Sequence, residues 1–145
     1  QQVGLHRVKN LAKLTPKEGG SLLDDTSFQR KLNETEIQLE SIQYTEFRLM
    51  AALAKGESPG PESSVLKTLS ADIQQQLTEL SVEAIAEFAA AHQPEARTVG
   101  ANTVSIGHDD GKMAFTQYFN LRASSIAGGT NEVQKNIIAK MVLGL

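Results

Sequence analysis

The longest apolar pattern in the chain runs from Phe28 to Leu53, and it constrains the fold more than any other feature. Hydrophobic side chains recur there at steps of three and four residues, and only Thr35 and Glu46 interrupt them. This spacing predicts one helix with a single apolar face about seven turns long. Isolated helices of that length are rare, so the pattern favours a helical bundle.

The flanking residues predict where the helices of the first half begin and end. Residues 1–14 show loosely helical apolar spacing, and residues 15–25 interrupt it with one proline and two glycines. The long helix is expected to begin near Thr26 or the next residue. It would follow Asp24 and Asp25, whose negative charge suits the positive end of a helix.

A third helix is predicted after the turn at residues 55–64. Pro61 suits its first position, because a proline there loses no helical hydrogen bond. The helix is expected to reach about Ala91, with a seam formed by Leu66, Leu69, Ile73, Leu77, Leu80, Ala84 and Phe88. Residues 93–111 then form a long connection with little periodicity, a kind of loop that is often functional or mobile.

Two shorter helices are predicted at the C-terminal end, over about 112–126 and 131–143. Apolar residues of the first include Met113, Phe115, Phe119, Leu121 and Ile126. The second is expected to bury a stripe formed by Val133, Ile137, Ile138, Met141 and Val142. No segment predicts a β-sheet.

Composition narrows the class of protein. The chain has 145 residues, enough for one domain with its own core, and no cysteine, which excludes disulfides and thiolate chemistry. A net charge of −3 without a basic run argues against nucleic acid as a partner, and no apolar run predicts a membrane span. The first ten residues lack a signal peptide and resemble the middle of a helix, so we expect the chain to be part of a longer protein.

The connection between the last two predicted helices contains Gly128, Gly129 and Thr130. One glycine can end the first helix, Thr130 can cap the second, and Glu132 lies in a first turn that favours negative charge. These residues can therefore form a plain helix–turn–helix corner. Alternatively, the paired glycines let a ligand approach the backbone beside an exposed helix N-terminus. Spacing alone leaves both interpretations open.

The last residues, SSIAGGTNEVQKNIIAKMVLGL, closely resemble the C-terminal signature of acyl-CoA dehydrogenases, I-x-x-G-T-x-E-x-Q-x-x-I-I-A followed by V-L-G-L. Two earlier stretches are similar to the same family, in the same order. TSFQRKLNETEIQLESIQYTEFR resembles the family helix that begins near a Phe-Gln pair. GESPGPESSVLKTLSADIQQQL resembles its Gly-x-x-Pro-Gly-x-x-x-Ser-x-x-Lys connection into the next helix.

The resemblance implies an all-α fold, a four-helix bundle with an extra short C-terminal helix. Residues 1–145 would be the C-terminal helical domain, without the family's N-terminal helical and middle β-domains. The implied activity is α,β-dehydrogenation of an acyl-CoA thioester to the trans-2-enoyl-CoA in fatty acid metabolism, with FAD as cofactor. The implied partners are the acyl-CoA substrate, an electron-transfer flavoprotein and further subunits in a dimer or tetramer. The expected location is the cytoplasm.

The family's site residues can be carried over by position. Gly128 and Gly129 would line the substrate side of the corner. Thr130, Asn131 and Glu132 would approach the FAD. Gln29, in the Phe-Gln pair, would contact the FAD of a neighbouring subunit; a solvated helix residue is the alternative.

Three departures from the family pattern concern the chemistry. Many members have a catalytic glutamate where this chain has Gly128, so no catalytic base is assigned. The base would then come from an earlier helix upstream of Gln1, or this subunit would be the non-catalytic half of a heteromer. Residues 11–25 lack the family's Arg-x-x-Phe-Gly, and the stretch after Gln93 lacks a Gly-Gly pair. These two losses predict a loosened FAD site, and a plain helical interaction domain is a third possibility.

The remaining polar residues predict structural roles. His6, His92 and His108 are too far apart in sequence for a helical metal site, so exposed or capping roles are expected. Asp109 and Asp110 lack the rest of a calcium pattern and are expected to cap a helix. Arg122 is expected to form a structural salt bridge.

Overall fold

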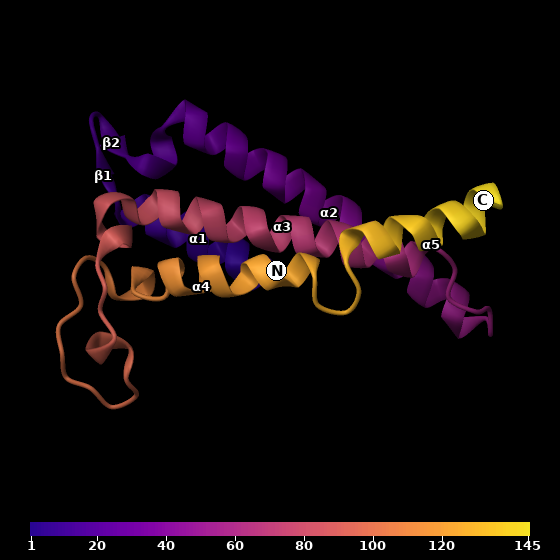
Figure 1. Cartoon of the computed structure of the whole chain (residues 1–145). Coiled ribbons are helices and arrows are strands. Elements are labelled where there is room, and N and C mark those ends of the chain that lie inside the picture. The colour runs from indigo at the N-terminus through magenta and orange to yellow at the C-terminus, as the bar shows by residue number, and fades with distance from the viewer.

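Helix α3 (Glu62–Ile85) is the centre of the computed structural model, which describes all residues 1–145. It contacts each of the other four α-helices, and Figure 1 shows it between α2 and α4. Those helices are α1 (Gln2–Leu14), α2 (Thr26–Ala54), α4 (Ala114–Leu121) and α5 (Asn131–Leu143). Helices α1 to α4 form a four-helix body and α5 extends beyond it, which confirms the predicted fold class.

The start of α2 agrees with the sequence prediction. Asp25 caps the helix, because its Oδ1 accepts a hydrogen bond from the backbone N–H of Phe28 at 2.9 Å. Its other carboxylate oxygen accepts from Lys17, and both contacts lower the pKa of the Asp25 carboxyl, Lys17 contributing most. The cap therefore begins the long helix at Thr26 and ties it to the preceding segment.

The preceding segment corrects one prediction, since it contains two short strands. Strands β1 (Pro16–Lys17) and β2 (Gly20–Ser21) pair antiparallel, with Pro16 opposite Ser21 and Lys17 opposite Gly20. The 3₁₀ helix η1 (Leu22–Asp24) follows and leads into α2. Two residues per strand are too few to show the alternating hydrophobic pattern that predicts a sheet.

The core lies where α1, α2 and α3 meet. Its largest fully buried side chains are Phe28, Leu11, Ile73 and Val8. Along α2 the predicted seam is buried from Phe28 to Ile42, including Thr35, whose hydroxyl donates to the carbonyl of Lys31. Farther along, Leu53 is 44% exposed, because α2 continues past the end of α1 (Figure 1). The buried part of α2 is thus shorter than the predicted apolar seam.

Two predicted helices end earlier than expected. Helix α3 stops at Ile85, where Ala86 adopts a positive φ of 49°, and the 3₁₀ helix η2 (Ala86–Ala90) follows. Of its predicted seam, Leu69 and Phe88 are exposed. The fourth predicted helix is α4 followed by the 3₁₀ helix η5 (Arg122–Ser125). The C-terminal ends of α3 and α4 depend on local backbone geometry, which cannot be predicted from the spacing of apolar residues.

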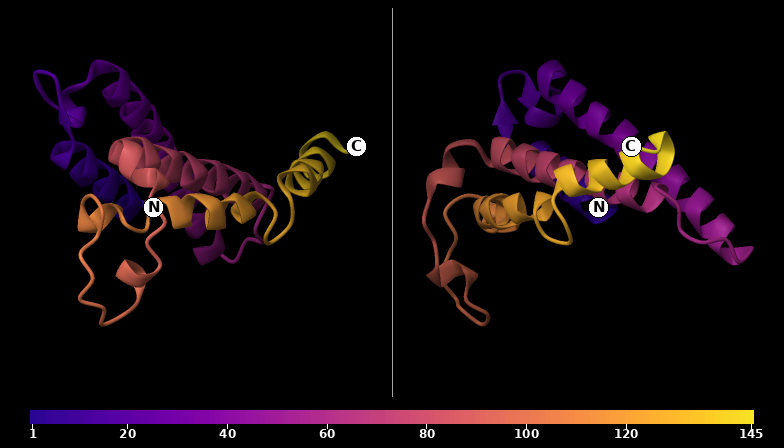
Figure 2. Two further views of the ribbon diagram at one scale, coloured as in Figure 1. Left: turned by 60° about the vertical axis from the view of Figure 1, so that its left-hand side comes forward. Right: turned by 45° about the vertical axis from the view of Figure 1, so that its right-hand side comes forward.

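The long connection between α3 and α4 contains two more 3₁₀ helices, η3 (Glu95–Arg97) and η4 (Asp109–Gly111). The side-chain amide of Gln93 closes it, accepting from the N–H of Ile106 at 2.7 Å and donating to its carbonyl at 3.0 Å. Figures 1 and 2 show this connection projecting from the four-helix body. The polar end of Gln93 is therefore used within the connection itself.

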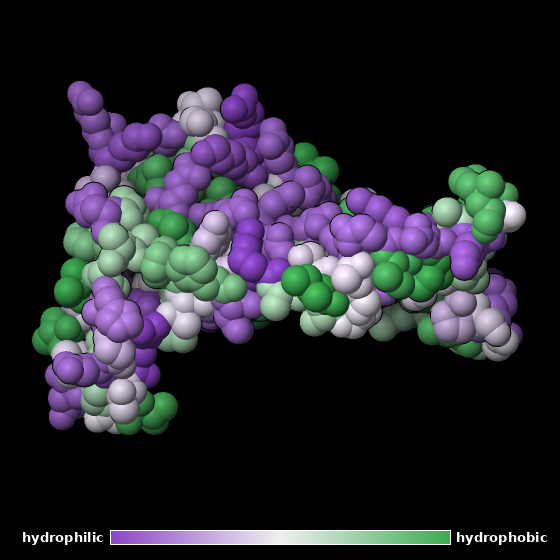
Figure 3. Space-filling model, in the orientation of Figure 1, coloured by the Kyte–Doolittle hydropathy of each residue, from purple (hydrophilic) through white to green (hydrophobic).

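The predicted buried stripe of α5 is wrong, because no residue of this helix is buried. Val133 is 48% exposed and Met141 57%, and the left view of Figure 2 shows α5 projecting away from the four-helix body. Apolar surface is visible along α5 and at the C-terminal end in Figure 3. Because α3 is its only extensive neighbour, most of the apolar stripe has nothing to pack against.

None of the helices combines the length and the hydropathy that crossing a bilayer requires. No group of three or more His, Asp and Glu side chains is close enough together to hold a metal ion.

Phe28→Ala tests the position of the core. Removing a fully buried ring leaves a cavity, so we expect the free energy of unfolding to fall by about 3–5 kcal/mol. Ile37→Ala is the matched control on the same helix, because Ile37 is exposed and its loss should change stability by no more than about 0.5 kcal/mol. Urea unfolding followed by circular dichroism measures both, and equal losses would contradict the described core.

Candidate functional site

The corner between η5 and α5, residues 126–130, leaves its backbone open on one side. Gly128 and Gly129 have φ of 70° and 93°, a region that strains residues with a side chain. A Cβ added at Gly128 would meet no atom within 4 Å, so the main chain there is exposed. A Cβ at Gly129 would come within 2.8 Å of the side-chain nitrogen of Gln134. The backbone conformation therefore explains both glycines, and the free space at Gly128 leaves room for a ligand.

Two side chains fix the junction of this corner with α5. The Thr130 hydroxyl accepts from the N–H of Val133 at 3.3 Å, which makes Thr130 the helix cap predicted from sequence. Gln134 reaches back and donates to the carbonyl of Gly128 at 3.1 Å. Of the other N–H groups of the first turn, that of Glu132 contacts its own carboxylate, and that of Asn131 has no partner inside the helix. The N–H groups of this helix start carry partial positive charge beside the open main chain of Gly128.

Polar side chains of α3 hold both ends of the corner. Lys67 donates to the carbonyl of Ser125 at 3.4 Å and to Oδ1 of Asn131 at 3.2 Å. The amide nitrogen of Asn131 donates to Asp72 at 3.2 Å, so both polar atoms of this side chain face α3. Gln75 donates to the hydroxyl of Ser125 at 3.3 Å. The corner is therefore anchored to the central helix on its η5 side and on its α5 side.

Arg122 forms the structural salt bridge that the sequence analysis predicted. Its guanidinium donates to Glu79 at 2.7 Å and to the Gln75 carbonyl and Thr78 hydroxyl at 2.9 Å. The same group lies 4.5 Å from the centre of the Tyr118 ring. All of these partners belong to α3 and α4, so Arg122 joins the two helices just before the corner.

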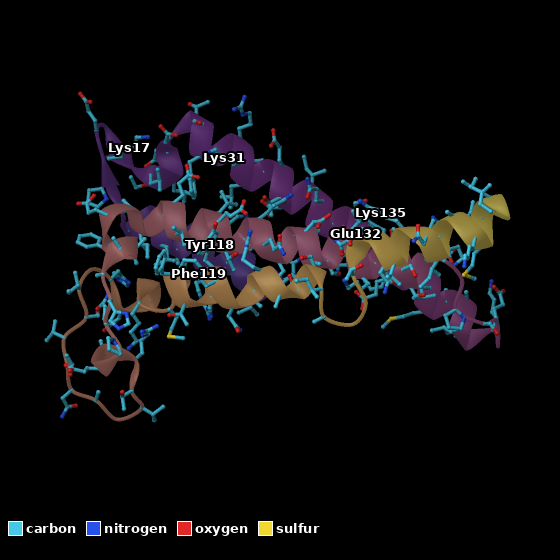
Figure 4. The ribbon with its side chains drawn as sticks, viewed as in Figure 1. Lys17, Lys31, Tyr118, Phe119, Glu132 and Lys135 are labelled. Carbon is cyan, nitrogen blue, oxygen red and sulfur yellow. The ribbon has the colours of Figure 1, made fainter.

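Glu132 lies in the first turn of α5, near Lys135 (Figure 4). Its own backbone N–H and then the Thr130 hydroxyl lower the pKa of the Glu132 carboxyl, with smaller contributions from Lys135 and Lys67. A general base in a closed site needs a pKa raised toward neutrality. The lowered pKa and the exposed position argue that Glu132 does not replace the acid missing at Gly128.

Gln29 does not lie with the other predicted cofactor residues. It is an exposed residue in the first turn of α2, whereas the corner lies at the opposite end of the four-helix body (Figure 1). The structure brings together Gly128, Gly129, Thr130 and Glu132, with the Asn131 side chain turned toward α3. If Gln29 contacts the cofactor of a neighbouring subunit, it should lie far from the corner of its own chain, as it does here.

The other polar candidates have structural roles. His6 and His92 are exposed. His108 caps η4 by accepting from the N–H of Asp110 at 3.3 Å. The capping role expected of the histidines is thus confirmed for His108, whereas the prediction that Asp109 and Asp110 cap a helix is wrong, because both lie inside η4 after its cap.

The sequence analysis assigned no role to two residues whose side chains contact the corner or its ends, Lys67 and Gln134. Lys67 is the lysine that ends the Gly-x-x-Pro-Gly-x-x-x-Ser-x-x-Lys pattern, and Gln134 is the glutamine of the C-terminal signature. Both patterns could be seen in the sequence. Only the tertiary structure shows that Lys67, from the first pattern, contacts Asn131, in the second.

The sequence matches the family model for the acyl-CoA dehydrogenase C-terminal domain over residues 2–143. This chain belongs to the acyl-CoA dehydrogenase family. The match includes the corner and the whole four-helix body, so the resemblance seen in the short patterns extends over the acyl-CoA dehydrogenase domain described here. No curated protein sequence matches the chain significantly.

Solved structures share the fold of this acyl-CoA dehydrogenase domain. Butyryl-CoA dehydrogenase from Megasphaera elsdenii aligns with 98% of the chain at a TM-score of 0.75 and 15% identity. A chain of the ChsE4–ChsE5 complex from Mycobacterium tuberculosis aligns with 99% at 0.71 and 24% identity. A structure described for the electron transferring flavoprotein of Acidaminococcus fermentans aligns with 98% at 0.74 and 15% identity. The present chain covers 32%, 34% and 33% of those chains, respectively.

Glu132→Gln tests the electrostatics of the α5 start. The pKa of Glu132 is lowered from its ordinary 4.5, so its ionised form stabilises α5 above about pH 5, and this contribution is lost as the pH falls through the lowered value. NMR chemical shifts of residues 131–143 should show less helix in the variant than in the wild type at pH 7, and the difference should shrink as acid protonates Glu132. Glu40→Gln, an exposed change on α2, is the control. A difference that does not decrease with falling pH would contradict the assignment.

Proposed function

We propose that this chain is the C-terminal domain of a flavin-dependent acyl-CoA dehydrogenase that converts an acyl-CoA thioester to the trans-2-enoyl-CoA. The observation that carries the proposal is the open corner at Gly128 and Gly129, whose main chain is exposed beside the N-terminus of α5. Family membership supports the same reaction.

The residues at the corner fit a flavin cofactor. The backbone N–H of Asn131 at the start of α5 offers a hydrogen-bond donor, and the free space at Gly128 permits close approach to the main chain. We assign FAD contacts to Thr130, Glu132 and the backbone of Asn131, whose side chain is held on α3, with Gln29 contributing to the site of a neighbouring subunit. When bound, FAD would accept the hydride that leaves the β-carbon of the thioester. Gly128 and Gly129 would leave space for that thioester.

The catalytic base is assigned to a part of the protein outside these residues. Gly128 stands where many family members carry a glutamate, and Glu132 has a lowered pKa and an exposed carboxylate. The chain covers about a third of the solved relatives, so most of the substrate pocket would also come from elsewhere. The substrate's chain length and branching would be set by that pocket.

The proposed partners follow from the reaction. The reduced flavin must be reoxidised, and an electron-transfer flavoprotein is the expected acceptor, in the cytoplasm. The exposed apolar residues of α5 are consistent with assembly into a homo- or hetero-oligomer, a dimer or a tetramer, in which neighbours would cover them. Such an assembly would also allow Gln29 to reach a second subunit's cofactor.

A non-catalytic subunit is the second candidate function. Gly128 favours it, because the corner itself provides no group that can remove the α proton. The similar fold of the ChsE4–ChsE5 complex supports a heteromeric arrangement as a possibility to test. In this case the chain would supply helices and an interface to an active partner.

Thr130→Val in the complete protein tests the cofactor assignment. The wild type should copurify with flavin that absorbs near the flavin maxima and loses colour when acyl-CoA is added. The variant should retain several-fold less flavin and lose about 1 kcal/mol of helix capping. Thr45→Val is the control, because its hydroxyl contacts only the Ser41 carbonyl, on α2.

The two candidate functions give different results in this experiment. Flavin in the wild type that acyl-CoA does not reduce, even though it binds, would favour the non-catalytic subunit. A wild type that contains no flavin, alone or with a partner subunit, would contradict the proposed function. Equal flavin content in Thr130→Val and Thr45→Val would contradict the role of Thr130.

A further inference from the structure

Lys67 is the one side chain that contacts both sides of the open corner. It is half-buried on α3, and its ammonium donates to the carbonyl of Ser125 at 3.4 Å and to Oδ1 of Asn131 at 3.2 Å. Ser125 is the last residue of η5 and Asn131 is the first of α5. A single cation therefore spans the five residues between these two helices.

The contact with Asn131 is specific in orientation. Lys67 holds the amide oxygen, and Asp72 accepts from the amide nitrogen at 3.2 Å. Lysine has only donors and the Asp72 carboxylate only acceptors, so the amide has one favourable orientation between them. The first residue of α5 is therefore fixed against α3.

Electrostatics set Lys67 apart from an ordinary stabilising lysine. No carboxylate forms an ion pair with it, unlike Lys9, Lys17 and Lys31. Its ammonium lies beside the N-terminus of α5, where positive charge is unfavourable. Glu132 offsets this in part, since Lys67 contributes to the lowered pKa of that carboxyl. The two contacts of Lys67 set the distance between these two helix ends.

The corner needs such a fixed distance. Glycine has more backbone freedom than any other residue type. Without a contact that holds its ends, the turn at Gly128 and Gly129 would therefore sample many conformations. We propose that Lys67 is a positioning residue, which holds the η5 and α5 ends at the spacing that aims the corner's N–H groups at the flavin. This inference rests on the proposed function, because it assumes that a flavin binds at the corner.

The test uses the complete protein and three variants. Lys67→Met removes the charge and keeps the length, Lys67→Arg keeps charge and donors, and Lys31→Met removes a lysine whose ion pair with Glu83 lies between α2 and α3. Hydrogen exchange of peptides covering residues 122–134 is measured without cofactor, and the dissociation constant for FAD alone is measured by titration. Lys67→Met should exchange at least tenfold faster in this segment and bind FAD about tenfold more weakly, the effect of one lost charged hydrogen bond.

The two control variants define the outcome. Lys67→Arg should recover most of both effects, and Lys31→Met should match the wild type. Exchange in Lys67→Met that equals exchange in Lys31→Met would overturn the inference, as would faster exchange with unchanged FAD affinity. A wild type that does not bind FAD would contradict the proposed function, and the exchange measurement would then decide by itself whether Lys67 holds the corner.

Discussion

Burial of α3 against all four other α-helices is the interaction on which the rest of this structure depends. Ile73 and Leu77 lie in the core with Phe28 of α2 and Val8 of α1, and they fix the position of α3. The core holds α3 from Ile73 to Ile85, with Leu66 packed against it, so the polar side chains on the other face of this helix have defined positions too. The candidate site is therefore positioned by apolar packing that is remote from it.

Polar side chains on the outward face of α3 connect this core to the corner. Lys67 and Asp72 hold the start of α5, and Gln75 holds the end of η5. The corner can then remain open, because α3 anchors its ends and only the carbonyl of Gly128 is held from within, by Gln134. Such a site combines a rigid frame with an exposed main chain, which suits a ligand that must approach backbone N–H groups closely.

The fold and the corner were largely predictable from local pattern. The Asp25 cap, the Thr130 cap and the first half of the α2 seam, from Phe28 to Ile42, each depend on residues within a few turns of one another, and each was confirmed. The errors have physical causes of a different kind. Leu53 and the α5 stripe have the spacing of a buried face, but burial depends on neighbours, and the end of α2 and most of α5 have few in this chain.

The sequence by itself determined that this chain forms helices joined by a glycine corner, and it indicated the acyl-CoA dehydrogenase family through short patterns at that corner. These features follow from backbone preference and local spacing, which are properties of neighbouring residues. Only the tertiary structure decided that Lys67 reaches Asn131, that Gln29 lies at the other end of the four-helix body, and that the α5 stripe is exposed. Those facts depend on how distant segments pack, and packing is set by the whole core at once.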